Sequence, residues 1–576
     1  MKTTRWIINE TDADLALMSQ VLGITEITAN VMANRGLRTK KTALSFLAPS
    51  LEKMHDTVEM KGMPEAMALI NDAVKSGAKI TVYGDYDVDG VMSTVIMLKA
   101  LGKLGANVDY YIPHRIQEGY GLNEDAVRSL HESGTEILLT VDNGISAIDE
   151  IAIANQLGMK VIVLDHHEPG FTKTEDGRED ILPQADAIID PKQASCPYPF
   201  KELCAGGLAY KLATALLPQE DSELLILAAL ATVCDIVSLQ DENRIIVKEG
   251  LAALNENKLI NPGLGSLIAT RGYLDKPIDT FTIGFILGPC LNATGRLGSA
   301  SQSVELLLSD PADPPETRIS LAAKLCALND ERKQLTADCV ERALSNLPDP
   351  MDKVLVIVDP DAHESVAGIV AGRIKEATGH PTILLTQGDG AMKGSGRSIE
   401  GYNLFEALFH HRHLFFRFGG HPMAAGLTLD AENIPALREA LNADCQLTDE
   451  DFGAVMHIDR ELEFNEVNMR LSQELTALAP FGKDNREPLF VSRKLYVDNC
   501  RVMNEKNTLI FSFNAGGGRV KGIAFGLNDA YAQATQAADV RPVGGFYMDA
   551  AYLVETNVYN GVASVQMRVR DFRVVK

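Results

Sequence analysis

The most constraining feature of this sequence is a series of short apolar runs that each end in acidic residues. The runs cover residues 79–85, 136–142 and 160–167, and segments with helical patterns over 64–77, 91–105, 124–134 and 145–158 alternate with them. Apolar strands that alternate with helices are typical of a parallel sheet covered on both faces. Because open parallel sheets bind ligands at the carboxyl ends of their strands, the pattern predicts an acidic site at one sheet edge.

The rest of the chain divides into segments of different character. We expect an N-terminal helical segment over 1–60, an α/β domain over 61–315, a connecting helix over 316–347 and a second α/β domain over 348–450. Two Gly-rich stretches of the second domain, 393–398 and 418–426, are predicted to be turns. Over 451–576, short strand-like runs at roughly 10-residue spacing predict a small β-barrel, an OB-fold.

Composition limits the classes of protein to which the chain can belong. Its 576 residues carry 54 Lys and Arg against 78 Asp and Glu, a formal charge of −24. This charge argues against binding nucleic acid through a basic overall field, but it allows an enzyme that gathers arginine and metal in one groove. No apolar run reaches the ~20 residues that span a membrane, and the N-terminus does not resemble a signal peptide. Because the eight cysteines are scattered, we expect reduced thiols, a cytoplasmic location and no membrane contact.

The acidic sheet edge has the residue types of a divalent-metal site. Its members are Asp85, Asp87, Asp89, Asp142, Asp165, His166 and His167, and Asp235 follows in a helical region. Carboxylates held close together raise each other's pKa unless cations neutralise them. Oxygen ligands with an imidazole suit Mn²⁺ or Mg²⁺ better than structural Zn²⁺. Two such ions about 4 Å apart would bind and hydrolyse a phosphodiester, so the edge predicts a two-metal phosphoesterase.

Simpler interpretations of each motif are weaker. Asp85, Asp87 and Asp89 also match the start of an EF-hand loop, but Ile96 stands where that loop needs its twelfth-position Glu. A His-His pair alone often fills a core or a surface, and Asp-Asn-Gly alone is usually a turn. Their occurrence at successive strand ends favours one shared site.

The motifs resemble those of the DHH phosphoesterase superfamily. GDYDVDG (84–90), TVDNGIS (140–146), LDHH (164–167) and TVCDIVSL (232–239) stand in that family's order. LGPCLNATGR (287–296), KGSGRS (393–398), FGGHPMAAG (418–426) and the segment 480–490 resemble motifs of members with a DHH-associated second domain and a C-terminal OB-fold. The resemblance spans essentially the full chain. It implies a metal-dependent, single-stranded-DNA-specific 5′→3′ exonuclease that releases 5′-mononucleotides in DNA repair and recombination.

The resemblance also implies residue roles and partners. The implied ligands of two Mn²⁺ or Mg²⁺ ions are Asp85, Asp87, Asp89, Asp142, His166 and Asp235, with Asp142 as the bridge. The residues implied to act at the scissile phosphate are Asp142, His166, His167 and Arg296. Those implied to bind the 5′-phosphate are Arg115, Ser395 and Arg397. Asn292, His363 and His421 would contact DNA. The implied partners are single-stranded DNA, a single-strand-binding protein and a RecQ-type helicase, and we expect a monomer.

Two alternatives remain open at this point. A DHH enzyme for small substrates, such as short oligonucleotides, cyclic dinucleotides or pyrophosphate, would not need the roughly 120 residues that follow the second α/β domain. A catalytically inactive scaffold would be expected to have broken metal motifs, and these are whole. One departure lies at Ala362-His363-Glu364-Ser365, where family members commonly have Trp-His-x-Gly, so the substrate channel there is expected to differ.

Overall fold

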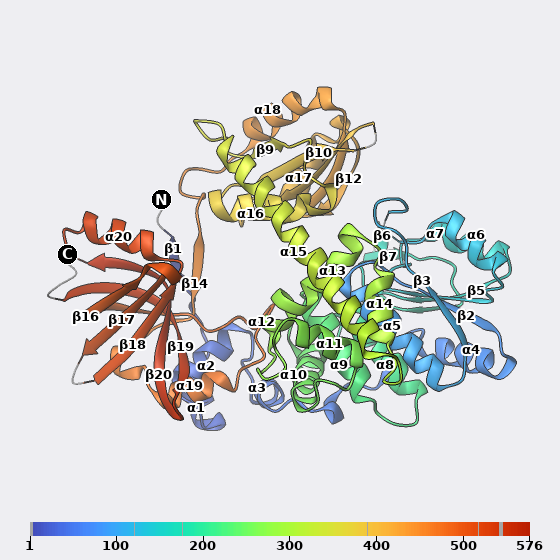
Figure 1. Ribbon diagram of the computed structural model, residues 1–576, viewed down its shortest axis with the longest axis horizontal. Coiled ribbons are helices and arrows are strands. Elements are labelled where there is room, and N and C mark those ends of the chain that lie inside the picture. The colour runs from blue at the N-terminus through green and yellow to red at the C-terminus, as the bar shows by residue number, and fades with distance from the viewer. Residues whose placement is uncertain are drawn as a thin grey trace.

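The computed structural model describes residues 4–119, 121–174, 177–388, 390–515, 518–540 and 545–575. A parallel five-stranded sheet of order β3-β2-β4-β5-β8 forms the base of the first α/β domain (Figure 1). Its strands are β2 (Lys79–Tyr83), β3 (Asn107–Tyr111), β4 (Ile137–Val141), β5 (Lys160–Leu164) and β8 (Ala187–Ile189). The predicted parallel sheet is therefore confirmed, with its strands where the apolar runs placed them.

Helices cover both faces of this sheet. They are α4 (Met63–Ser76), α5 (Val88–Lys103), α6 (Glu124–Glu132) and α7 (Ile148–Gln156). Alternate residues of one strand enter different cores: Ile137 and Leu139 pack with α4 and α5, whereas Leu138 packs with α6 and α7. This two-sided burial explains why the strands are apolar throughout. A hairpin of β6 (Gly170–Thr174) and β7 (Gly177–Ile181), which the sequence analysis did not predict, follows β5.

A helical layer extends the first domain beyond the sheet. It comprises α8 (Ala205–Leu216), α9 (Ser222–Cys234), α10 (Asp241–Glu256), α11 (Pro262–Thr270), α12 (Thr280–Thr282), the π-helix η3 (Ile283–Leu287), α13 (Gly288–Leu297) and α14 (Ser301–Leu308). The apolar faces of α8 and α9 pack against α5 within one shared core. The first turn of α5 is thereby held between the sheet and this layer.

A single long helix, α15 (Pro315–Ser345), leads from the first domain to the second (Figure 1). Its N-terminal half buries Ala322, Leu325 and Cys326 in the core of the first domain. Its C-terminal half buries Cys339 and Ala343 against α16 (Ala367–Thr378) of the second domain. The predicted connecting helix is thus present, and each of its ends is packed on a different domain.

The second domain is a mixed five-stranded sheet of order β12-β13-β11-β10-β9. Its strands are β9 (Leu355–Val358), β10 (Thr382–Gln387), β11 (Met392–Arg397), β12 (Phe415–His421) and β13 (Ala424–Leu429), joined by α17 (Leu404–His410) and α18 (Ile434–Asp444). The prediction of a turn over 393–398 is wrong, because β11 runs through that stretch, and within 418–426 the turn is limited to Pro422 and Met423, between β12 and β13. A Cβ on Gly394 would lie 2.6 Å from the Leu385 side chain, and one on Gly396 would lie 2.6 Å from that of Leu404. These glycines let leucines pack across the strand, a role that composition alone does not distinguish from a turn.

The C-terminal strands close into a barrel. β16 (Phe490–Met503), β17 (Thr508–Ala515), β18 (Gly518–Phe525), β20 (Val562–Val575) and β19 (Phe546–Tyr559) pair in that order, and β19 pairs again with β16. The predicted barrel is confirmed, and β15 (Arg460–Glu461), α19 (Met469–Thr476) and α20 (Asn528–Ala537) accompany it. Phe511 and Phe513 are buried in its core, whereas Phe525 is exposed.

The N-terminal segment packs with this barrel and contains a strand. β1 (Arg5–Ile8) pairs in parallel with β14 (Val455–Ile458). The helices α1 (Leu15–Leu22), α2 (Glu26–Asn34) and α3 (Lys40–Leu47) contribute to the core that also holds the barrel side chains. The expectation of a purely helical segment over 1–60 is therefore wrong at β1, because a strand whose partner is so distant leaves little local signal.

Membrane-spanning length is not reached by any single helix in the described part of the chain. Only α1 and α2 taken together meet the length and composition needed, and they meet at a bend of 110°.

Candidate metal centre and nucleic-acid cleft

The acidic residues converge where β2, β4 and β5 end. Asp87 caps α5, and its Oδ1 accepts a hydrogen bond of 3.1 Å from the Gly90 amide. Because α5 begins at Val88, Asp89 lies in its first turn, whereas the helical pattern in the sequence begins only at residue 91. Gly90 is required by space, since a Cβ there would lie 2.6 Å from the backbone N and O of Asp85.

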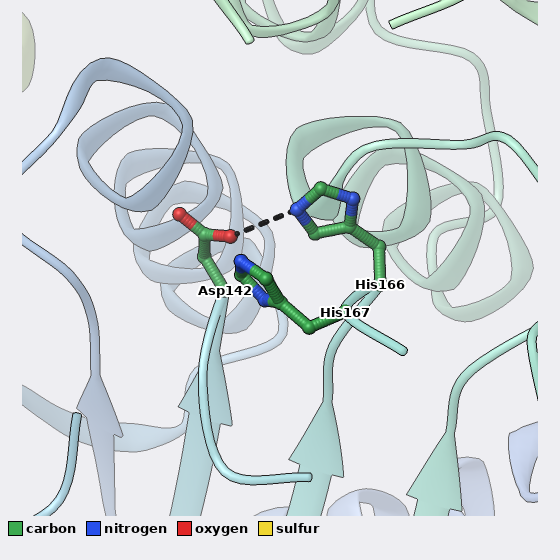
Figure 2. A group of neighbouring side chains, drawn as sticks. All are labelled: Asp142, His166 and His167. Atoms are coloured by element: carbon green, nitrogen blue, oxygen red, sulfur yellow. Dashed lines mark ion pairs between the residues drawn. The ribbon is translucent and has the colours of Figure 1, made fainter. Parts of the chain in front are cut away.

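His166 lies at the centre of three carboxylates. Its Nε2 is 3.2 Å from Asp142 Oδ1 and 3.7 Å from both Asp89 Oδ2 and Asp235 Oδ2. Figure 2 shows the Asp142 carboxylate and the His166 ring pointing toward each other from adjacent strand ends. Asp142 has a φ of +64°, a left-handed conformation that costs energy in a non-glycine residue and occurs often at functional sites.

The side chains form overlapping groups of potential metal ligands. Asp89, His166 and Asp235 form one group and Asp85, Asp87 and Asp142 another, with the ligand atoms of each group within 4.8 Å of one another. Asp142 also groups with His166 and His167, so it links the two sets. Asp85 Oδ1 is buried without a hydrogen-bond partner. An oxygen-rich set with an unsatisfied carboxylate oxygen and one imidazole fits two hard divalent ions such as Mn²⁺ or Mg²⁺.

Several carboxyl groups of this centre have raised pKa values, which indicates that their negative charges need neutralising cations. Burial, followed by repulsion from Asp87, raises the pKa of Asp85 and that of Asp89 to about 7. Burial and Asp89 raise the pKa of Asp235 to about 8, and burial and the surrounding carboxylates also raise that of Asp142. Burial, with repulsion from His167, lowers the pKa of His166 to about 3, so its imidazole is neutral and keeps a lone pair for a metal.

His167 has the opposite protonation state. Its Nδ1 lies 2.7 Å from Asp165 Oδ1. Asp165 Oδ1 also accepts from the His166 amide, and Asp165 Oδ2 accepts from that of Ile145. Burial opposes the charge on His167, but the hydrogen bond to Asp165 outweighs it and raises the pKa of His167 to about 9. A protonated imidazole cannot ligate a metal, but it can donate a hydrogen bond to an anion.

A group of arginines lies beside the acidic cluster. Burial, then the charges of Arg115 and Arg332, lowers the pKa of Arg296 to about 10. Arg115 lies over the Tyr86 ring at 4.9 Å, and Arg296 Nη1 donates to the Ser365 carbonyl of the second domain at 2.6 Å. Guanidinium groups gathered in this way favour an anion with several oxygens, such as a phosphate.

The other predicted contact residues are held by local interactions. Arg397 Nη1 donates to Ser395 Oγ at 3.2 Å, and His363 Nδ1 lies 2.7 Å from Ser365 Oγ. His421 is exposed at the end of β12, where its Nδ1 accepts from the Met423 amide at 3.3 Å. Asn292 Oδ1 is buried without a partner. The two halves of the predicted 5′-phosphate pocket, Arg115 and the Ser395–Arg397 pair, are thus each assembled within their own domain.

A cleft of about 1660 Å³ runs between the first domain and the barrel. Val88, which lies between Asp87 and Asp89, lines it together with Asn292, Arg296 and Arg332, so the cleft reaches the acidic cluster. From the barrel side it is lined by Val558, Arg568 and Arg570.

Sequence reasoning missed several cleft residues. Phe281 and Phe285 stack at 4.9 Å between ring centroids and are 58% and 64% exposed. They are four residues apart in an apolar segment and so resemble core positions, which hides their exposure. Arg332 was missed because it belongs to an ordinary charged helix. Only the packing of α15 on α13 brings it to the cleft.

Each domain matches a described protein family. Residues 79–234 match the DHH family, N-terminal domain; residues 351–446 match the DHHA1 domain; residues 458–571 match the RecJ OB domain. The fold and site therefore define a DHH-family phosphodiesterase, a hydrolase with an appended OB domain.

Full-length relatives make the assignment more specific. The single-stranded-DNA-specific exonuclease RecJ of Bacillus subtilis is 40% identical over 88% of this chain, which spans 63% of that protein's length. RecJ of Salmonella typhimurium is 33% identical over 94% of both chains. The chain belongs to the RecJ family of single-stranded-DNA-specific exonucleases.

Solved structures agree with this assignment. RecJ of Thermus thermophilus in complex with Mn²⁺ superposes with a TM-score of 0.82 at 30% identity, covering 100% of this chain and 80% of that one. The same protein in complex with Mg²⁺ gives a TM-score of 0.76 at 28% identity, covering 100% and 79%.

Proposed function

We propose that this enzyme removes nucleotides from the 5′ end of single-stranded DNA and releases 5′-mononucleotides in DNA repair and recombination. The observation that carries the proposal is the position of the Arg115–Arg296–Arg332 group beside the acidic cluster, where Arg296 and Arg332 line a cleft between two domains. A terminal phosphate bound by arginines at a fixed distance from the cluster would place one internucleotide phosphate at a time for cleavage.

The acidic cluster would hold two Mn²⁺ or Mg²⁺ ions. Asp85 and Asp87 would serve one ion, Asp89, His166 and Asp235 the other, and Asp142 both. When bound, such a pair of ions polarises the phosphate, activates a water and stabilises the leaving oxygen. The chain's own contribution is to fix these ligands: Asp87 by capping α5, and Asp142 through its left-handed backbone.

Residues around the cluster would position the substrate. Arg296 would bind the scissile phosphate, and His167, kept protonated by Asp165, would donate a hydrogen bond to it. Arg115 with Ser395 and Arg397 would bind the 5′-phosphate across the two α/β domains. Asn292, His363 and His421 would contact the DNA, and the position of Asn292 in the lining of the cleft supports this role for its side chain.

The wider setting is also a proposal. The free cysteines support a reducing cytoplasm. The substrate partner is single-stranded DNA, with a single-strand-binding protein and a RecQ-type helicase as further proposed partners of a monomer. We propose the division 1–60, 61–315, 316–347, 348–450 and 451–576; the separate cores of the first and second α/β domains support its middle boundaries.

The deciding experiment is degradation of a single strand of about 40 nucleotides, longer than one OB-fold covers, labelled at its 3′ end. Mn²⁺ or Mg²⁺ is added, with EDTA, a full duplex and a 5′-blocked strand as controls. We expect metal-dependent shortening from the 5′ end that spares the blocked and duplex strands. Asp142→Asn should abolish it. Arg115→Gln should weaken the preference for a 5′-phosphate, whereas Arg128→Gln, an exposed arginine paired with Glu124, should not.

Other results would support the alternatives. An intact 40-nucleotide strand together with cleavage of dinucleotides would indicate a small-substrate phosphoesterase. Binding of the strand without any cleavage would indicate a scaffold. Shortening from the 3′ end would contradict the proposed polarity.

A further inference from the structure

Two cysteines meet at the contact between the helix that carries Arg296 and the helix that links the domains. Cys290 lies in α13 and Cys326 in α15, with exposed fractions of 0% and 6%. Arg271 contacts both residues, at the Cys290 sulfur and at the Cys326 carbonyl, so the two cysteines are neighbours across the contact between the helices. Neither residue has a role in the proposed cleavage reaction.

The surroundings of the Cys290 sulfur favour its thiolate. Arg271 Nε donates to Cys290 Sγ at 3.2 Å, and Asn329 Nδ2 donates to it at 3.5 Å. In the protonated form, the thiol donates to the Ile286 carbonyl at 3.2 Å. The influence of the neighbouring Cys326 thiol, and after it that of Arg271, outweighs burial and lowers the pKa of Cys290 to about 6, while the pKa of Cys326 is raised. Cys290 is therefore the nucleophilic thiol of the pair, and Cys326 the proton donor.

Arg271 belongs to this site through geometry as well as charge. Its Nη2 donates to the Cys326 carbonyl at 3.0 Å, and its guanidinium pairs with Asp330 at 3.3 Å. The guanidinium thus holds α11 and α15 together while it faces the Cys290 sulfur. Because the Asp330 side chain is 59% exposed, the Arg271–Asp330 ion pair reaches the surface beside the buried cysteines.

We propose that Cys290 and Cys326 form a peroxide-responsive disulfide that joins α13 to α15. The Cys290 thiolate attacks one oxygen of hydrogen peroxide, and the O–O bond breaks to give a sulfenic acid and, after protonation, water. The Cys326 sulfur then attacks the sulfenic sulfur, and the S–O bond breaks to release a second water as the Cys326 proton is taken up. Two thiols are oxidised and one peroxide is reduced, so no further reagent is needed.

The effect of the disulfide on the cleft would be transmitted through the hydrogen bonds of Asn329. Asn329 Oδ1 accepts from Arg332 Nε at 3.1 Å and from Arg332 Nη2 at 2.9 Å, while Asn329 Nδ2 donates to Cys290. Arg332 lines the cleft. Oxidation removes the thiolate that Asn329 and Arg271 face, and so loosens the hold on Arg332 and lowers activity on single-stranded DNA.

The test treats the full chain with hydrogen peroxide in the presence of EDTA and then digests it with trypsin without reduction. We expect peptides 272–296 and 325–332 to be found cross-linked, lighter by two hydrogen atoms than their sum and separated by dithiothreitol. Cys326→Ser should abolish the cross-link and leave sulfenic acid on Cys290, which a sulfenic-acid-specific probe detects. Cys339→Ser is the matched control, since Cys339 lies on the same helix but donates to Asp359 Oδ2 at 3.0 Å. That variant should cross-link as the parent chain does.

Further outcomes decide the proposal. Arg271→Gln should slow cross-linking several-fold, because the thiolate loses its cation. After EDTA removal and metal addition, the oxidised parent chain should degrade single strands several-fold more slowly, with recovery after dithiothreitol. Absence of the 272–296/325–332 cross-link in the folded chain, or a cross-link confined to denatured protein, would overturn the proposal. A full cross-link with unchanged activity would overturn its link to the cleft.

Discussion

At the scale of single residues, the metal centre is a site whose charges are incompatible without cations. Several carboxyls with raised pKa surround a neutral His166. A carboxyl whose folded pKa lies above its unfolded value favours folding only while it stays protonated, so its ionisation destabilises the metal-free protein as pH rises. Bound cations remove that cost and release the protons.

We therefore predict that Mn²⁺ stabilises the protein more as pH rises. Asp85 and Asp89 titrate near 7 and Asp235 near 8, so the rise in Tm on adding Mn²⁺ should grow between about pH 6 and about pH 8.5. Thermal unfolding at constant ionic strength, with and without Mn²⁺, measures it. The Asp142→Asn variant should show a smaller gain at every pH. A gain in Tm that does not vary with pH in the parent chain would contradict this account.

The sequence predicted the acidic and imidazole side chains of the site but not all of their neighbours. Asp142 and His166 follow strands whose ends must coincide in a parallel sheet, so their proximity could be inferred. The position of Arg332 depends on how α15 packs on α13, and the protonation of His167 depends on the orientation of Asp165. Neither is a local property of the sequence.

At the scale of elements, α13 approaches the loop after β2 very closely. A Cβ on Gly295 would lie 2.2 Å from the Tyr86 carbonyl oxygen, a contact that only glycine avoids. In the neighbouring π-helix, a Cβ on Gly284 would meet only Val233, at an ordinary 3.8 Å. The two glycines of one helical stretch therefore differ sharply in how much space they need.

We predict that Gly295→Ala displaces α13 from the metal centre. It should lower stability by about 1–3 kcal/mol, the usual cost of overpacking, and reduce exonuclease activity strongly, because Arg296 moves with the helix. Gly284→Ala should change stability by less than about 1 kcal/mol. Denaturant unfolding and activity on the labelled strand measure both variants. Equal stability and activity of the two variants would show that the close approach of α13 to the loop after β2 is not required for either property.

Secondary structure could be predicted best where it is locally coded. The strands of the parallel sheet are continuous apolar runs, and those of the barrel alternate between turn residues, so both were found. The glycine-containing strand β11 was predicted to be a turn. The leucines that pack against its glycines belong to β10 and α17, so the local sequence does not show that the glycines lie in a strand. β1 was missed because its hydrogen bonds come from β14.

At the scale of the whole molecule, one buried arginine joins three parts of the chain. Arg244 of α10 is 1% exposed, and its guanidinium lies 3.6 Å from the centre of the Phe46 ring. Its Nε donates to the Phe46 carbonyl at 2.8 Å and its Nη2 to the Ala479 carbonyl at 2.9 Å. The first domain is thereby tied to the N-terminal helices and to the segment before the barrel.

We predict that Arg244→Ala loosens the barrel from the first domain. Loss of the guanidinium leaves buried carbonyls unpaired, which should cost about 3 kcal/mol. Thermal unfolding should show the loss, and limited proteolysis should cut first near residues 477–488. Arg373→Ala, at a largely exposed arginine, should remain within about 0.5 kcal/mol of the parent chain. A parent-like proteolysis pattern in Arg244→Ala would argue against this docking role.

We also predict that single-strand binding in the cleft depends on salt concentration, because arginines line the cleft. Arg570 lines the cleft from the barrel side, so Arg570→Gln should weaken single-strand binding and reduce the slope of log K against log salt by about 0.7. Binding titrations at several salt concentrations, with catalysis blocked by EDTA, measure the slope. Arg519 of the same barrel is ion-paired with Asp498, as Arg570 is with Glu487, but it does not line the cleft, so Arg519→Gln should leave the slope unchanged. If the slope were the same for Arg570→Gln and Arg519→Gln, the DNA would not bind along the Arg570 side of the cleft.

The pairing of β1 with β14 has a consequence for how the chain is made. Residues 5–47 leave the ribosome well before residues 462–572, whose side chains bury α1–α3. At translation rates of about 5–20 residues per second, this apolar segment waits on the order of a minute for its partners. During that time it is a natural client for a nascent-chain chaperone, and each nascent chain can donate the segment to the barrel of a neighbour on the same polysome.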